Sequence, residues 1–129
     1  MTHTTFMDKF PVNTLVINKS ETSASSIDDI LKHYESKIQK HPIATYIAIF
    51  DHYAHTTALE GEINPEIKNA KNIIFCFGAA IPNSKILAIR PRSIGVAEKE
   101  DSFVIEFMDA PKEKLTEVMT EWTQALLKD

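Results

Sequence analysis

Residues 27–38 read IDDILKHYESKI, and their apolar side chains recur at helical spacing. Positions i, i+3, i+4, i+7 and i+11 of this stretch are Ile27, Ile30, Leu31, Tyr34 and Ile38. Because an α-helix turns once in about 3.6 residues, these side chains form one stripe along its surface. Ser26 precedes the stripe as an N-cap residue, and Pro42 stops continuation of the helix. The stretch therefore predicts an amphipathic helix with a single face packed against a sheet.

A second helix is predicted with its apolar stripe over residues 115–126, where the same five offsets recur. Its apolar positions are Leu115, Val118, Met119, Trp122 and Leu126. Asp109, followed by Ala110 and Pro111, is predicted to open this helix, because proline is tolerated in a first turn. Each helix has one apolar face, so both are expected to cover a sheet and to keep their other side in water.

Five short runs rich in β-branched and aromatic residues predict strands. They cover residues 12–18, 45–50, 72–77, 93–98 and 102–107. The third run, NIIFCF, is apolar on both faces and so belongs inside the sheet, and a short turn joins the last two runs as a hairpin. The order β-α-β-β-β-β-α predicts an α+β two-layer sandwich, with a mostly antiparallel sheet and both helices on one face. Residues 52–70 and 79–91 fit no single element.

The composition is that of one globular domain, which we take to span residues 1–129. The net charge of −4 argues against nucleic-acid and charged-membrane partners, which require a basic surface. The longest apolar run, residues 73–81, falls short of the roughly 20 residues of a membrane helix. A single cysteine, Cys76, allows no intrachain disulfide, and the N-terminus carries no signal pattern. We therefore expect a reduced, cytoplasmic protein.

The densest group of titratable side chains is the segment DHYAH, which follows the second predicted strand. In a helix, Asp51 and His55 would lie one turn apart, and a metal site would also need a ligand such as Glu60 or Glu62. Alternatively, His52 or His55 is a general base that Asp51 orients, because histidine titrates near working pH. The structural alternative is that these residues end a strand and cap a turn.

Two arginines flank a proline before the fourth predicted strand. Arg90 and Arg92 would lie on one side of an extended segment, as planar donors for a carboxylate or a phosphate. Gly78, at the end of the third strand, allows close approach of a ligand or of backbone. The structural alternative pairs the arginines with nearby carboxylates, namely Glu98, Glu106 or Asp109. No GxGxxG or P-loop pattern is present, so we expect no cofactor.

The lone cysteine has a functional and a structural interpretation. Cys76 would be a nucleophile if a base lowered its pKa. Its sequence neighbours are all apolar, which favours a small buried hydrophobic residue instead.

The order of several short motifs resembles a bacterial family of small α+β proteins known as domain of unknown function 302. Between residues 49 and 111 the matching positions are Asp51-His52, Gly61, Phe77-Gly78, Pro91, Glu98 and Asp109 with Pro111. This chain departs from the family at Ala79-Ala80, where members usually have Asn-Pro. The resemblance implies the sandwich described above, often as a dimer, and implies no activity.

The leading hypothesis is a noncatalytic binding or interaction module. Two helices cover only one face of a sheet, so the second face is expected to meet another copy in a homodimer. A small anionic ligand is expected in a cleft lined by Asp51, His52, Gly78, Arg90 and Arg92. The alternatives are a small enzyme with His52 or His55 as base, and a metal-binding protein. Whether the protein is an enzyme is left open, and no metal is assigned.

Overall fold

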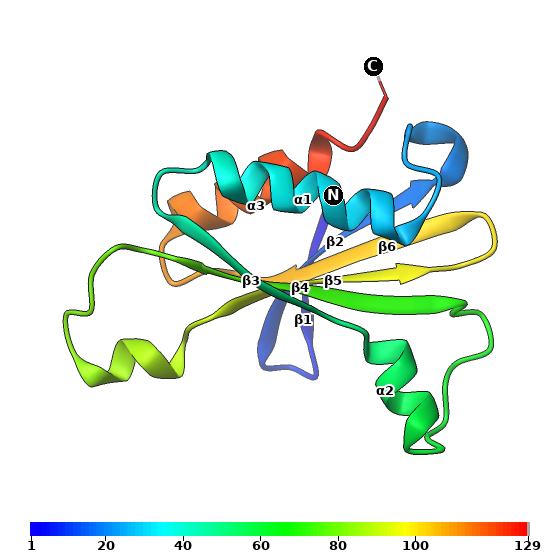
Figure 1. The fold of residues 1–129 in the computed structure, drawn as a ribbon, viewed down its shortest axis with the longest axis horizontal. Helices are drawn as coiled ribbons and strands as arrows, with labels where there is room; N and C mark the ends of the chain where they lie inside the picture. The colour runs from blue at the N-terminus through cyan, green and yellow to red at the C-terminus, as the bar shows by residue number, and fades with distance from the viewer. Residues whose placement is uncertain (129) are drawn as a thin grey trace.

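The computed structural model describes residues 1–128, which form one six-stranded sheet with three α-helices around it (Figure 1). The strands are β1 (Thr2–Phe6), β2 (Phe10–Asn18), β3 (Ala44–Phe50), β4 (Asn69–Phe77), β5 (Arg92–Glu98) and β6 (Ser102–Met108). The helices are α1 (Ile27–Lys40), α2 (His52–Ala58) and α3 (Glu113–Gln124), with 3₁₀ turns η1 (Lys19–Glu21) and η2 (Ser84–Ala88). The strand order is β1-β2-β6-β5-β4-β3, and every neighbouring pair is antiparallel. The predicted α+β class is confirmed.

Helix α1 forms as its sequence predicts. The Ser26 side chain caps it by accepting a hydrogen bond from the Asp29 backbone N–H at 3.2 Å. Its buried residues are the five of the predicted stripe, Ile27, Ile30, Leu31, Tyr34 and Ile38. The helix ends at Lys40, just before His41 and Pro42. The apolar face therefore rests on the sheet, as expected.

Helix α3 starts later than predicted. It begins at Glu113, its N-cap is Lys112, and Pro111 lies outside the helix. Asp109 does not open it, because its carboxylate instead accepts hydrogen bonds from His3 and Asn13. The N-terminus of α3 consequently has no side-chain cap.

The two long helices lie on the same face of the sheet and are joined by buried polar contacts (Figure 1). Tyr34 of α1 and Thr123 of α3 are fully buried, and their hydroxyl oxygens lie 2.7 Å apart. Thr123 donates its own proton to the Met119 carbonyl, so Tyr34 donates to Thr123. Burial raises the pKa of Tyr34 above its usual value, and the hydrogen bond to Thr123 opposes this in part. Both hydroxyl groups are therefore satisfied without water.

All five predicted strands are present. Strand β4 is interior, between β3 and β5, and β5 and β6 form the predicted hairpin. In β6, Phe103, Ile105 and Phe107 are buried, whereas Glu106 is exposed on the opposite face. The side chains of this strand therefore alternate between the two faces of the sheet.

The sequence did not indicate β1. All five of its side chains are exposed, so the strand has no alternation of apolar and polar residues. It pairs with β2 through a turn in which Met7 and Asp8 have positive φ angles. The unassigned residues 52–70 contain α2, and η2 lies in residues 79–91, where the Asn83 side chain accepts a hydrogen bond from the Lys85 N–H.

The face of the sheet opposite α1 and α3 carries a row of apolar side chains. Register places Val16 of β2 beside Val104 of β6, followed by Ala97 of β5 and Ala70 of β4. Val16 is 57% exposed, and α1 and α3 lie on the other face of the sheet, whereas the short helix α2 lies near β4 (Figure 1). Separately, none of the helices within residues 1–128 has the length and apolar character needed to cross a membrane.

The contact between the two long helices gives a stability prediction. Replacing Tyr34 with phenylalanine removes the donor to Thr123 and leaves the ring in place, so unfolding free energy should fall by about 1 kcal/mol. Urea unfolding followed by Trp122 fluorescence measures this. Tyr53→Phe, at a half-buried side chain for which no hydrogen bond of the hydroxyl is present, is the control and should change stability by less than about 0.5 kcal/mol. Equal losses in both variants would contradict this role for the Tyr34 hydroxyl.

Candidate functional site

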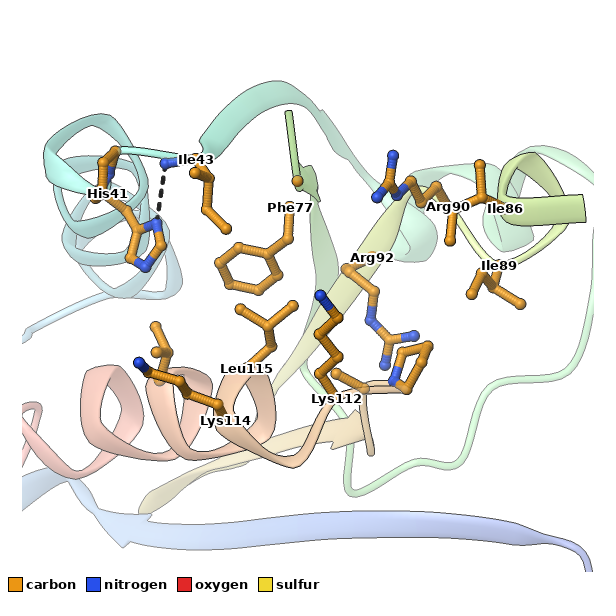
Figure 2. Close-up of a pocket in the computed structure, with 15 residues that line it drawn as sticks. His41, Ile43, Phe77, Ile86, Ile89, Arg90, Arg92, Lys112, Lys114 and Leu115 are labelled. Carbon is orange, nitrogen blue, oxygen red and sulfur yellow. Dashed lines mark hydrogen bonds between the residues drawn. The ribbon is translucent and has the colours of Figure 1, made fainter. Parts of the chain in front are cut away.

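A cavity of about 430 Å³ opens between the C-terminal ends of α1 and β4, the segment containing η2, and the N-terminus of α3 (Figure 2). Its apolar lining consists of Pro42, Ile43, Phe77, Ile86, Ile89, Ala110, Pro111, Leu115 and Val118. The other lining residues are His41, Gly78, Arg90, Arg92, Lys112 and Lys114. Within residues 1–128, the lining includes four permanent cations and no carboxylate. The site therefore combines hydrocarbon walls with positive charge.

The inner wall of the cavity is aromatic. Phe77 is only 3% exposed, and its ring centroid lies 5.5 Å from that of Trp122 and 5.4 Å from that of His41. Both neighbours pack against Phe77, so the ring is held from α1 and from α3. The last residue of β4 thus forms a rigid surface at the back of the cavity.

Gly78 directly follows β4 and has a backbone conformation that residues with a Cβ atom rarely adopt. Its φ angle is +99°, and its N–H donates to the Ile43 carbonyl at 2.9 Å. A Cβ atom at Gly78 would collide with Nη2 of Arg90. The sequence predicted close approach at this glycine, and in the structure the approaching group is the Arg90 guanidinium.

Arg90 is held at the cavity from the segment before β5. Its Nη1 donates to the Ala80 carbonyl at 2.8 Å, while its Nη2 lies against Gly78. It takes part in none of the ion pairs formed within residues 1–128. Its charge is therefore available to a ligand.

Arg92 has a more structural role than Arg90. Its Nη2 donates to the backbone carbonyls of Met108 and Asp109, both at 2.8 Å, which fixes the end of β6. Its Nε is buried and finds no partner among the described residues. Burial lowers the pKa of this guanidinium, and the charge of Asp109 opposes that shift.

The predicted alternative, in which both arginines pair with carboxylates, is wrong. Glu98 pairs with Lys19 at 2.7 Å, and the Glu106 carboxylate accepts from the Thr14 hydroxyl at 2.8 Å. Arg92 contacts the Asp109 backbone carbonyl, whereas the Asp109 carboxylate binds other partners.

His41, Lys112 and Lys114 are cavity residues that sequence reasoning missed. His41 follows α1, and its Nδ1 accepts the Ile43 N–H at 3.3 Å, so the ring proton lies on Nε2. Lys112 is the N-cap of α3, and Lys114 lies in its first turn. The late start of α3 places them at the mouth of the cavity (Figure 2). Only the tertiary position of this helix start could have revealed them.

The five predicted ligand residues do not share one cleft. Gly78, Arg90 and Arg92 line the cavity, but Asp51 and His52 follow β3 at the opposite end of the sheet. Register pairs Ala44 with Phe77 and Phe50 with Asn72, so β3 spans the sheet between the two groups. Seven strand residues extend roughly 20 Å. The prediction of a single cleft is therefore wrong, while an anion-binding role for the three cavity residues stays a prediction.

The second group forms the start of α2. The Asp51 carboxylate accepts from the Ala54 N–H at 2.9 Å, which caps the helix as the structural alternative anticipated. His52 and His55 are exposed and pack around Phe50, with ring centroids 5.3 Å and 5.2 Å from it. No contact between Asp51 and either imidazole is present to orient a base.

Neither Glu60 nor Glu62 completes a metal site with this group. Among residues 1–128, no cluster of three or more His, Cys, Asp or Glu side chains is placed to hold a metal ion. Cys76 is half-buried, with its sulfur 3.6 Å from the Phe77 carbonyl oxygen. Its neighbours in β4, Phe75 and Phe77, are buried against the helices, so strand alternation turns Cys76 to the other face.

A polar network outside the cavity holds the end of β6. His3 Nε2 lies 3.0 Å from the Asp109 carboxylate, and Asn13 donates to the same group at 2.7 Å. Burial alone would raise the pKa of Asp109, but the hydrogen bonds from His3 and Asn13 and the charges of His3 and Arg92 outweigh it. The net result is a pKa below the usual value. The network ties the edge strand β1 to the backbone that Arg92 also binds.

The chain belongs to a family of unknown function, DUF6858, which it matches over residues 1–128. Its fold is similar to the crystal structure of an uncharacterized conserved protein DUF302 from Bacillus stearothermophilus, with a TM-score of 0.58 and 10% sequence identity. That match covers 90% of this chain and 94% of the other. The predicted resemblance to domain of unknown function 302 is thus confirmed as a likeness of fold. No curated protein gives a significant sequence match.

The Asp109 network predicts a pH-dependent contribution to stability. Because the folded pKa of Asp109 is lowered, its contribution is present above the unfolded value of about 3.9 and is lost as pH falls through the folded pKa. Asp109→Asn should therefore be less stable than the parent protein at pH 7, and the difference should shrink below about pH 4.

Urea unfolding across this pH range measures the difference between the two proteins. Asp101→Asn is the control, because the Asp101 carboxylate forms no ion pair within the described residues, and it should match the parent at every pH. A difference for Asp109→Asn that stays constant from pH 7 to pH 3 would contradict the linkage.

Proposed function

We propose that the protein is a noncatalytic binding module that holds a small organic anion in the cavity and acts as a homodimer. The observation that carries the first part is a cavity with four cationic side chains and no carboxylate among its described lining residues. The whole chain has a net charge of −4, so this positive charge is local. A concentration of one charge sign in a cleft raises the local concentration of ligands of the opposite sign.

The cationic side chains of the cavity differ in how many of their N–H groups remain free to bind a ligand. Arg92 is largely committed to backbone carbonyls, so it supplies positive charge more than direct contacts. Arg90 keeps Nη2 and Nε outside its bond to Ala80, and Lys112 is exposed at the mouth. We assign the direct contacts with the ligand to Arg90 and Lys112, because charge-assisted hydrogen bonds to a carboxylate require donors of this kind.

The second part of the proposal is a homodimer through the sheet face that carries the row Val16, Val104, Ala97 and Ala70. Glu106 is the only charged side chain that strand alternation places on this face in β2, β4, β5 and β6. Depletion of charge is the compositional sign of an interface core. A second copy of the chain offers the same row across a two-fold axis, so the contact would be self-complementary.

A cytoplasmic location belongs to the same proposal. It is supported by the single cysteine, Cys76, which leaves the chain without an intrachain disulfide.

The anion proposal predicts a dependence of binding on charge. Butanoate should bind and shift the amide resonances of Gly78 and Leu115 in a nuclear magnetic resonance titration, whereas 1-butanol should bind much more weakly. Arg90→Gln and Lys112→Gln should each weaken butanoate binding roughly tenfold or more, the range for a hydrogen bond to a charged group. Lys85→Gln is the control, because Lys85 lies on η2 outside the cavity lining. Equal binding of acid and alcohol would overturn the proposal.

The dimer proposal predicts a mass of twice 14.6 kDa for the parent protein in sedimentation at micromolar concentration. Val16→Lys places a charge in the centre of the apolar row and should give monomers, because a buried unpaired charge is costly. Gln124→Lys adds the same charge on the exposed side of α3 and should stay dimeric. A monomeric parent protein would rule out this interface.

A further inference from the structure

We infer that the ligand of the cavity is an amphipathic carboxylate, an anion with a medium-length alkyl or aryl body, and that this body lies against Phe77 and Leu115. The inference rests on the proposed function and names its ligand class. A cavity of about 430 Å³ falls in the lower part of the range of roughly 300–1,000 Å³ for small-molecule sites. It has room for more than a carboxylate group alone.

Polar and apolar side chains occupy different parts of the cavity. The charged ends belong to exposed residues at the mouth, Lys112 and Lys114, and to Arg90 beside η2. Phe77 lies deeper, and Figure 2 shows its ring between Ile43 and Leu115. Charge at the rim and hydrocarbon inside match a ligand whose head is anionic and whose body is apolar.

The two side walls of the cavity carry apolar side chains that the protein leaves partly uncovered. Leu115 and Val118 of α3 form one wall, and they are only partly buried by the protein itself. Ile86 and Ile89 line the cavity from the segment around η2, and Ile89 is 44% exposed. Covering such surfaces with hydrocarbon removes apolar area from water, which stabilises the bound state.

A fully polar anion such as inorganic phosphate fits the cavity less well. Phosphate sites converge several backbone N–H groups on the oxygens. Here the Gly78 N–H already donates to the Ile43 carbonyl and Nη2 of Arg92 to two carbonyls, which leaves the uncapped start of α3 as the source of backbone N–H groups. A polar body inside would also meet apolar side chains that offer no hydrogen bonds. A carboxylate head needs only the free donors of Arg90 and Lys112.

The experiment is a chain-length series of butanoate, hexanoate and octanoate, each matched by the alcohol of the same length, with inorganic phosphate as the polar anion. Isothermal titration calorimetry measures the affinity of each ligand. Chemical-shift changes at the Gly78 and Leu115 amides show whether it binds in the cavity. Each added methylene should tighten carboxylate binding roughly threefold to fourfold until the cavity is full. The alcohols and phosphate should bind more weakly than octanoate.

Variants connect the length dependence to the walls. Leu115→Ser should reduce the gain in affinity for each methylene added from butanoate to octanoate, because it removes apolar wall surface. Val118→Thr, which conserves shape, should act in the same direction and serves if the first variant does not fold. Leu87→Ser is the control, because Leu87 is 57% exposed on η2 and does not line the cavity.

The outcomes separate this inference from the function it rests on. If butanoate binds and longer carboxylates bind no tighter, or phosphate binds more tightly than octanoate, the amphipathic class is wrong and anion binding survives. If no carboxylate of any length binds, or the alcohols bind as tightly as the acids, the proposed function itself is wrong.

Discussion

The packing of Trp122 against the end of β4 is the contact on which the rest of the molecule depends. Its ring centroid lies 5.8 Å from that of Phe75, 5.5 Å from that of Phe77 and 6.0 Å from that of His41. One side chain of α3 thus holds the last residues of β4 and the residue that follows α1. Aromatic groups in such tilted and edge-on arrangements add to the stabilisation from burial itself. Because Trp122 lies toward the C-terminal end of α3, the N-terminal end remains free to wall a cavity.

Helices and strands that bury only one face could be predicted from the sequence, because their apolar residues recur at the spacing of a helix or a strand. The stripe of α1 is buried residue for residue, and β6 alternates as its sequence indicates. Strand β1 has no buried side chain and therefore no period, so only its pairing with β2 identifies it. The start of α3 was misplaced because Asp109 had two possible uses. Its hydrogen bonds with His3 and Asn13 link positions far apart in the chain, which local patterns do not encode.

The candidate site shows the same division between local and tertiary information. Arg90, Arg92 and Gly78 were recognisable because each lies at a strand end, where polar groups and turns concentrate. Joining them with Asp51 and His52 failed for a geometric reason: an antiparallel pair brings the end of one strand to the start of its neighbour. The residues after β3 and after β4 therefore lie at opposite ends of the sheet. Lys112 and Lys114 could be identified as cavity residues only from the position of the α3 N-terminus. That position depends on packing at Trp122.

The hydrogen bonding of His41 bears on the proposal that this cavity binds a ligand without catalysis. His41 is the only histidine among the described lining residues, and its Nδ1 is occupied by the Ile43 N–H. A general base usually has a carboxylate or carbonyl that accepts from its second nitrogen and stabilises the protonated ring. In His41 a donor, the Ile43 N–H, occupies that nitrogen, so this arrangement differs from the usual one of a general base. Phe77 packs against the His41 ring, which makes His41 part of the cavity wall. In the proposed anion site, the Nε2 of His41 would add one more donor to those of Arg90 and Lys112.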